Sequence, residues 1–233
     1  MSLGREIALT ALLLVGSILF FGLSNLDEWV QDLLYNSQTH RWLLDHHLQP
    51  YRFIFYDGIK ALLILFALLM LAALLFGRKH PWVNAHRNGI LIVVLSAIIA
   101  PLTVSILKQE TNMPCPKHTI RYGGIYPHVA VWEHYPEHFR QPGRIQCWPA
   151  GHASGGFALL SLFFLFKRRE NRKRALLFAL TVGWLMGGYK MLIGDHYFSH
   201  TVITMLLSWL WILIIAAGVE RFMPSQEDRP VRP

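Results

Sequence analysis

Long apolar segments separated by short polar ones dominate the chain. A helix needs about 20 apolar residues to cross the hydrocarbon layer of a membrane. Six segments approach or reach that length: Ile7–Leu23, Phe53–Phe76, Ile90–Leu107, Gly155–Phe166, Ala175–Ile193 and Thr201–Val219. The fourth is short unless residues 151–154 join it. The pattern predicts an all-α bundle of six transmembrane helices, and the chain lacks a signal-peptide cleavage pattern, so the first segment is expected to remain as a span.

The polar connections predict further elements. Apolar residues recur at helical spacing among acidic ones in Asn25–His47, which predicts an amphipathic helix in the membrane interface. Prolines and a Gly-Gly pair interrupt Lys108–Ala150 and predict a long loop with turns, a kind of loop that is often functional. We expect residues 1–223 to form one membrane domain and the polar, proline-rich residues 224–233 to form a disordered cytoplasmic tail.

Charge determines the expected orientation. The net charge is +8, but the basic residues gather in short connections such as residues 78–87 and 167–174. Short basic loops between apolar spans mark the cytoplasmic side, so this charge predicts topology and not nucleic-acid binding. Both termini are then cytoplasmic, and the long loop lies outside the cytoplasm.

Two cysteines, Cys115 and Cys147, lie in the long external loop. An oxidising compartment permits a disulfide between them, which would constrain the loop; two unpaired thiols are the alternative.

Polar residues gather at three boundaries of the apolar segments. Lys108 ends one segment, Pro149–His152 begins another, and Lys190, His196 and His200 surround a third boundary. Charged groups at such boundaries are costly to desolvate and usually face a polar cavity. All three boundaries lie on the predicted external side, so they are expected to form one site.

These residue types suit phosphate chemistry without a metal. Cations and backbone amides can hold the phosphoryl oxygens, one histidine can attack phosphorus, and another can protonate the leaving group. The chain offers Lys108, Arg121 and Lys190 as cations, the Gly151 amide, and the imidazoles of His152 and His196.

The spacing of these residues resembles the three-part signature of the type-2 phosphatidic acid phosphatase superfamily, which is related to glucose-6-phosphatase and the vanadium haloperoxidases. The first part, Lys-x6-Arg-Pro, is matched by Lys108 and Pro116 with Cys115 at the arginine position. The second, Pro-Ser-Gly-His, is matched by residues 149–152 with alanine in place of serine. The third, Ser-Arg-x5-His-x3-Asp, is matched by residues 189–200, with Lys190 for arginine and His200 for aspartate.

The resemblance implies a catalytic site and a reaction. His196 would be the nucleophile and His152 the general acid, with His200 accepting a hydrogen bond from His196. Lys108, Lys190 and the Gly151 amide would bind phosphate. Arg121, or alternatively Arg144, would supply the charge that Cys115 lacks, and Ser154 would replace the missing hydroxyl.

The expected function is hydrolysis of a lipid phosphate or diphosphate through a phosphohistidine, without metal or cofactor. The resemblance implies substrates such as undecaprenyl diphosphate, phosphatidylglycerol phosphate, phosphatidate or lipid A phosphates, processed at the periplasmic face of a bacterial inner membrane. The alternatives are a lipid-to-lipid phosphotransferase and a non-catalytic accessory protein. A zinc site at His134 and His138 with nearby glutamates is less favoured than a solvated loop, because prolines flank these residues and a further ligand is not evident.

Overall fold

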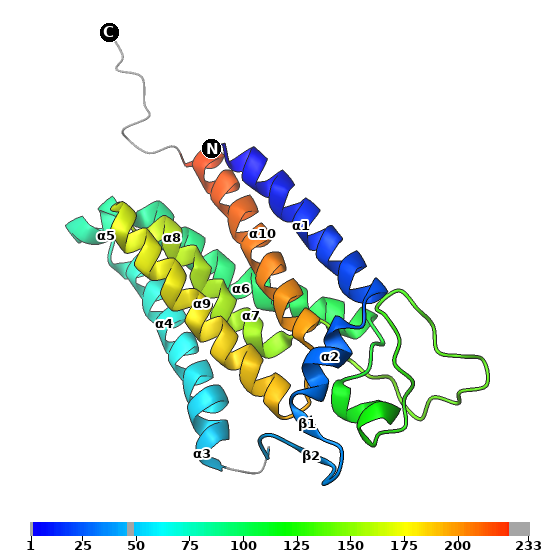
Figure 1. Ribbon diagram of the computed structural model, residues 1–233. Helices are drawn as coiled ribbons and strands as arrows, with labels where there is room; N and C mark the ends of the chain where they lie inside the picture. The colour runs from blue at the N-terminus through cyan, green and yellow to red at the C-terminus, as the bar shows by residue number, and fades with distance from the viewer. Residues whose placement is uncertain (1, 46–48, 224–233) are drawn as a thin grey trace.

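The computed structural model describes residues 2–45 and 49–223 and is built almost wholly from helices (Figure 1). The longest are α1 (Leu3–Leu23), α4 (Gly58–Phe76), α6 (Arg87–Glu110), α9 (Arg169–Leu192) and α10 (Phe198–Phe222). Shorter helices are α2 (Leu26–Asp32), α3 (Gln49–Arg52), α5 (Pro81–Ala85), α7 (Gly151–Ala158) and α8 (Leu162–Leu165). A π-helical stretch, Phe53–Asp57, joins α3 to α4, and a 3₁₀ turn, Leu159–Ser161, joins α7 to α8.

Five of the described helices are long and apolar enough to cross a membrane, as a multi-pass membrane protein requires. They are α1, α9, α10, α6 and the continuous helix that begins at Pro50 and includes α4. The predicted fourth span forms the shorter apolar segment Gly151–Leu165. The number of crossings therefore stays a prediction, while the helical, membrane-compatible architecture is confirmed.

The segment α7–α8 runs antiparallel to α6 along most of its length. A Cβ added to Gly151 would lie 3.6 Å from the Nζ atom of Lys108, near the end of α6. At the other end, Gly89 of α6 abuts the backbone of Leu165. The beginning of α1 and the end of α10 lie at one end of the bundle, whereas the long loop lies at the other (Figure 1).

The core lies between α6, α7, α9 and α10, where Ile90, Phe157, Ala179 and Ile212 are fully buried. Small residues allow these helices to approach closely, since a Cβ at Gly156 would lie only 2.7 Å from the Cα atom of Gly183. By contrast, Thr10 is the one buried residue of α1, and α4 has no buried residue among those that the structure describes, so these two helices present the surface expected to face lipid.

The predicted amphipathic helix over Asn25–His47 is wrong in its extent. Helix α2 ends at Asp32, and β1 (Tyr35–Asn36) pairs antiparallel with β2 (Arg41–Trp42). The reason is local: the Asn36 side chain accepts hydrogen bonds from the backbone N–H groups of Gln38 and Thr39, and this closes a turn. Residues 46–48 lie outside the described residues, as does the predicted tail, 224–233.

The orientation of α2 also differs from the prediction. An amphipathic interfacial helix would turn its apolar side away from water, whereas α2 turns polar residues toward the bundle. Its polar residues face inward: the Gln31 side chain donates to the Met191 carbonyl, and Asp27 accepts from the Ser199 N–H at 2.8 Å. Trp29 remains 61% exposed. Helix α2 therefore packs through polar contacts with the end of α9 and the start of α10.

The long loop spans residues 111–150 and contains two 3₁₀ turns, Pro116–His118 and Ile120–Tyr122. The turns that its prolines and glycines predict are thus confirmed, and Cys115 and Cys147 form the predicted disulfide. Because the backbone N–H of Lys117 donates to the Gly194 carbonyl, the loop also contacts the connection between α9 and α10.

Candidate active site

The three sequence motifs meet at the loop end of the bundle. Lys108 lies near the end of α6, His152 in the first turn of α7, and His200 in the first turn of α10. The α9–α10 connection carries His196, and Lys190 lies at the end of α9. The beginnings of α7 and α10 are joined directly, because the Ala150 N–H donates to the His200 carbonyl at 3.3 Å.

Three histidines form a compact cluster. The ring centres of His152 and His196 are 6.1 Å apart, and the Nδ1 atoms of His196 and His200 lie 3.3 Å apart, within hydrogen-bond distance. His200 is fully buried, and 3% of the His196 surface is exposed. His196 precedes α10 in an irregular connection, so the contact with His200 arises from the turn and not from a shared helical face.

The disulfide lies against this cluster. The Sγ atom of Cys147 is 3.6 Å from Nδ1 of His196 and 2.9 Å from the carbonyl oxygen of Asp195. The bond joins the segment after α6 to the residue two positions before Pro149. The disulfide therefore links the first motif to the second, and it lies beside His196 of the third motif.

Asp195 bridges two lysines beside His196. Its Oδ1 atom is 2.7 Å from the Lys117 ammonium, and its Oδ2 atom is 2.8 Å from the Lys190 ammonium. Lys190 is largely shielded from solvent, with 12% of its side chain exposed, whereas the value for Lys117 is 43%. Sequence reasoning missed Lys117, although its position directly after Pro116 of the first motif was the available signal.

A sharp turn places Asp195 and His196. Gly194 has a φ of 74°, a left-handed conformation that glycine adopts without strain. The backbone N–H groups of Asp195 and His196 both donate to the Lys190 carbonyl, which folds the connection back onto the end of α9. Adjacent residues therefore point their side chains at different partners: Asp195 at the lysines and His196 at the histidine cluster.

Electrostatics favour an ionised Asp195 beside a neutral His196. Burial alone would raise the pKa of Asp195, but the hydrogen bonds and the charges of Lys117 and Lys190 together outweigh it and lower this pKa. Burial, reinforced by His200, holds the pKa of His196 well below its usual value of 6.5. A neutral imidazole has the lone pair that a nucleophile requires.

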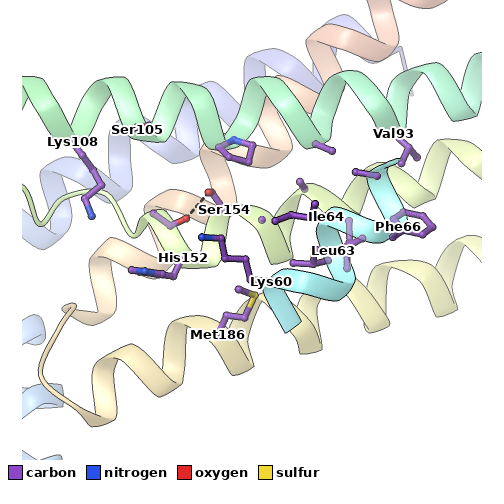
Figure 2. A pocket seen from close by; sticks show the side chains of 17 residues that line it. Lys60, Leu63, Ile64, Phe66, Val93, Ser105, Lys108, His152, Ser154 and Met186 are labelled. Carbon is purple, nitrogen blue, oxygen red and sulfur yellow. Dashed lines mark hydrogen bonds between the residues drawn. The ribbon is translucent and has the colours of Figure 1, made fainter. Parts of the chain in front are cut away.

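A cavity of about 480 Å³ opens beside the site (Figure 2). Its polar part includes Lys60, Ser105, Lys108, His152 and Ser154, and most of the rest of its wall is apolar. The apolar lining includes Leu63 and Phe66 of α4, Val93 of α6 and Met186 of α9. A cavity with lysines at one part of its wall and apolar residues at the rest is suited to a molecule that has an anionic group and an apolar chain.

Two other predicted site residues have structural partners. Arg121 forms a bidentate ion pair with Asp32 at 2.6 and 2.9 Å, and it is not among the residues that line the cavity. Ser154 lines the cavity, but its hydroxyl donates to the Gly151 carbonyl at 2.7 Å. Asp57, which lies three positions before the cavity residue Lys60, forms an ion pair with Arg52 at 3.2 Å.

Three residues of the same site have side chains of the kind that bind metal ions. Among the described residues, Cys147, His196 and His200 place ligand atoms within 4.8 Å of one another. The Cys147 sulfur is bonded to Cys115, however, so it lacks the thiolate that a metal requires.

Comparison with known families agrees with the geometry. The model of the PAP2 superfamily matches residues 89–224, a segment that contains Lys108, His152, Lys190, His196 and His200. Curated proteins and solved structures gave no match. The family match covers more than half of the chain and includes each of the three motif regions. The chain belongs to the PAP2 superfamily.

Proposed function

We propose that this protein is a membrane lipid phosphatase that hydrolyses a phosphate or diphosphate ester through a phosphohistidine on His196. The observation that supports this most directly is that Lys108 and His152 line a cavity that is cationic at one part and apolar elsewhere, while the ring of His196 lies 6.1 Å behind that of His152. Superfamily membership supports phosphatase chemistry. The geometry suggests a distinct role for each residue.

In the proposed reaction, Nε2 of His196 attacks phosphorus, because Nδ1 faces His200. The negative charge of the bound phosphate favours the protonated form of His152. As the bond between phosphorus and the leaving oxygen breaks, His152 gives its proton to that oxygen. Water then attacks the phosphohistidine and gives a proton back to His152, which releases inorganic phosphate and restores His196. His200 accepts the Nδ1 proton of His196 in a hydrogen bond that fixes its tautomer.

Cations and amides would stabilise the phosphoryl oxygens. Lys108 lies beside the start of α7, where the N–H of Gly151 and the helix dipole favour an anion. Lys190 supplies a second ammonium, which Asp195 holds close to His196. We expect phosphate to bind through these groups without a metal ion, and catalysis that withstands a chelator would agree with this.

The cavity suggests how a lipid would bind. Its phosphate would contact Lys60, Lys108 and His152, while its apolar chain would lie against Leu63, Phe66 and other apolar residues. We propose that the site faces the periplasm of a bacterial inner membrane, because the basic connections lie at the opposite ends of the spans.

The direct test is phosphate release by the purified protein in detergent. The panel contains matched lipid monophosphates and diphosphates together with water-soluble phosphate esters that lack a long chain. We expect release from at least one lipid and far slower release from its water-soluble counterpart. Equal rates would contradict a role for the apolar cavity, and no release from any lipid would contradict the function. Phosphate that appears on an added acceptor lipid would instead indicate a phosphotransferase.

Lys117 is expected to replace the motif arginine that Cys115 lacks. Its ammonium lies 2.7 Å from Asp195, the residue that precedes the nucleophile in the sequence, whereas Arg121 pairs with Asp32. We expect Lys117→Met to lower kcat/KM by about tenfold or more, because a charge-assisted phosphate contact contributes roughly 1.5–3 kcal/mol. Arg121→Met is the matched control and should have a smaller effect. The reverse order of the two effects would return the phosphate-binding role to Arg121, the replacement for the motif arginine that the sequence suggested.

The pH dependence follows from the lowered pKa of His196. Burial disfavours its charged form, so the imidazole stays neutral as the pH falls through 6.5 and is protonated only at lower pH. We expect the acidic limb of kcat/KM to lie clearly below pH 6.5. Rates measured on either side of this pH in detergent of constant composition check the prediction, and a half-maximal value near 6.5 would contradict it.

A further inference from the structure

The buried cluster next to the disulfide has the dimensions of a metal site. The Sγ atom of Cys147 lies 3.6 Å from Nδ1 of His196, and this nitrogen lies 3.3 Å from Nδ1 of His200. The ligand atoms of the three residues all lie within 4.8 Å of one another. Each of the three residues is at least 97% buried, since the largest exposed fraction is the 3% of His196.

These distances match the edges of a zinc tetrahedron. Zinc binds imidazole nitrogen at about 2.0–2.1 Å and thiolate sulfur at about 2.3 Å. Tetrahedral angles then separate two nitrogens by about 3.3–3.4 Å and a nitrogen from a sulfur by about 3.6 Å. Two edges of the cluster already have these lengths, and the third, between Cys147 and His200, is at most 4.8 Å long.

The disulfide prevents binding because the sulfur has no thiolate form while it is bonded to Cys115. A dithiol or a phosphine that breaks the bond supplies two electrons, and the two sulfurs take up two protons. On coordination, the Cys147 thiol loses its proton to water. The proton between the two Nδ1 atoms moves to Nε2 of its ring, so that both Nδ1 lone pairs face the ion.

We propose that Cys147, His196 and His200 form a binding site for zinc or a similar divalent ion, which the Cys115–Cys147 disulfide keeps closed. The oxidised protein excludes the ion, and the reduced protein binds it. A bound ion occupies His196, so it blocks the phosphoryl transfer proposed above. That consequence rests on the proposed function, whereas metal binding itself does not.

Two variants provide a matched test in the full-length, tag-free protein. Cys115→Ser breaks the disulfide and leaves the Cys147 thiol in place, whereas Cys147→Ser breaks the same bond and leaves the thiol at Cys115. Each variant is equilibrated with zinc buffered by a weak chelator, and bound zinc is measured per chain. Cobalt(II) replaces zinc in a second series, because its absorption spectrum distinguishes thiolate coordination.

We expect Cys115→Ser to bind one ion per chain with a thiolate–cobalt band, and Cys147→Ser and the oxidised wild type to bind at least about tenfold more weakly. Adding His200→Ala to Cys115→Ser should weaken binding without removing the thiol. If Cys115→Ser does not fold, the wild type reduced with a phosphine gives the same comparison before and after reduction. Equal binding by the two cysteine variants, or no binding by any reduced form, would overturn the site.

Activity provides a separate readout. Zinc should inhibit phosphate release by Cys115→Ser and leave the oxidised wild type unaffected at the same free concentration. If no form releases phosphate, the proposed function fails while the binding result still decides the metal site. If zinc binds Cys115→Ser and release continues unchanged, the ion does not occupy the nucleophile, and the inhibitory part of the proposal is overturned.

Discussion

Replacing His196 by alanine is expected to reduce phosphate release by roughly 10³-fold or more, because the residue that forms the covalent intermediate has no substitute. The change removes a side chain that is 3% exposed and contacts His200 and the disulfide. Initial rates with the best lipid of the panel measure the effect. Radiolabelled phosphate that remains on the denatured wild type and is absent from His196→Ala would identify the intermediate.

The control is His138→Ala, which makes the same chemical change at an exposed position in the long loop. It should retain the wild-type rate. Melting temperatures of both variants show whether lost activity reflects unfolding. A folded His196→Ala protein with full activity would exclude the proposed nucleophile.

A comparison with His152→Ala separates nucleophile from acid. Loss of a general acid costs about 10²–10⁴-fold when the leaving group needs a proton. An aryl phosphate has a leaving group that departs without one, so we expect it to restore much of the rate of His152→Ala and none of the rate of His196→Ala. Equal losses of both variants on both substrates would contradict the assigned roles.

The second large effect concerns the disulfide. Cys115 and Cys147 are 32 residues apart, and closing a loop of this length lowers the entropy of the unfolded chain. The corresponding stabilisation is about 4 kcal/mol. We therefore expect the double variant Cys115→Ser/Cys147→Ser to lose about that much free energy of unfolding.

The measurement is a denaturant titration in one detergent, with the oxidised wild type as reference and the zinc concentration held low. The double variant avoids the metal site, because it has neither thiol. Protection of the loop against a protease gives a local measure, since residues 111–150 contain the bonded segment. A difference below about 1 kcal/mol would show that the bond restricts the unfolded chain little, because that chain is already compact without it.

Hydropathy predicted the helical architecture well, because membrane-length apolar segments have few alternatives to the helix. It failed over Asn25–His47, where spacing suggested one helix. The Asn36 side chain closes a turn there, and Tyr35 pairs with Trp42 across the hairpin. The spacing of apolar residues carries no information about such side-chain hydrogen bonds. The inward orientation of Gln31 was not predictable either, because its side chain donates to the carbonyl of Met191, which is 160 positions away in the sequence.

The motif residues were predictable because their spacing is local, and the structure places Lys108, His152 and His196 at one end of the bundle. The ionic partners were not. Arg121 was expected at the phosphate, but its partner Asp32 is 89 positions away in the sequence. Asp195 was not among the predicted site residues, yet the turn at Gly194 directs it to Lys117 and Lys190.

The exposed position of α4 has a kinetic consequence. This helix forms one wall of the cavity and exposes Leu62, Leu65 and Leu69 elsewhere on its surface, so the proposed lipid substrate would reach Lys60 and Lys108 from within the membrane plane. The concentration that governs turnover is then the mole fraction of substrate among the surrounding lipids or detergent, not its amount per volume of water. Adding detergent at a fixed amount of substrate lowers this mole fraction, so we expect it to lower the rate of phosphate release.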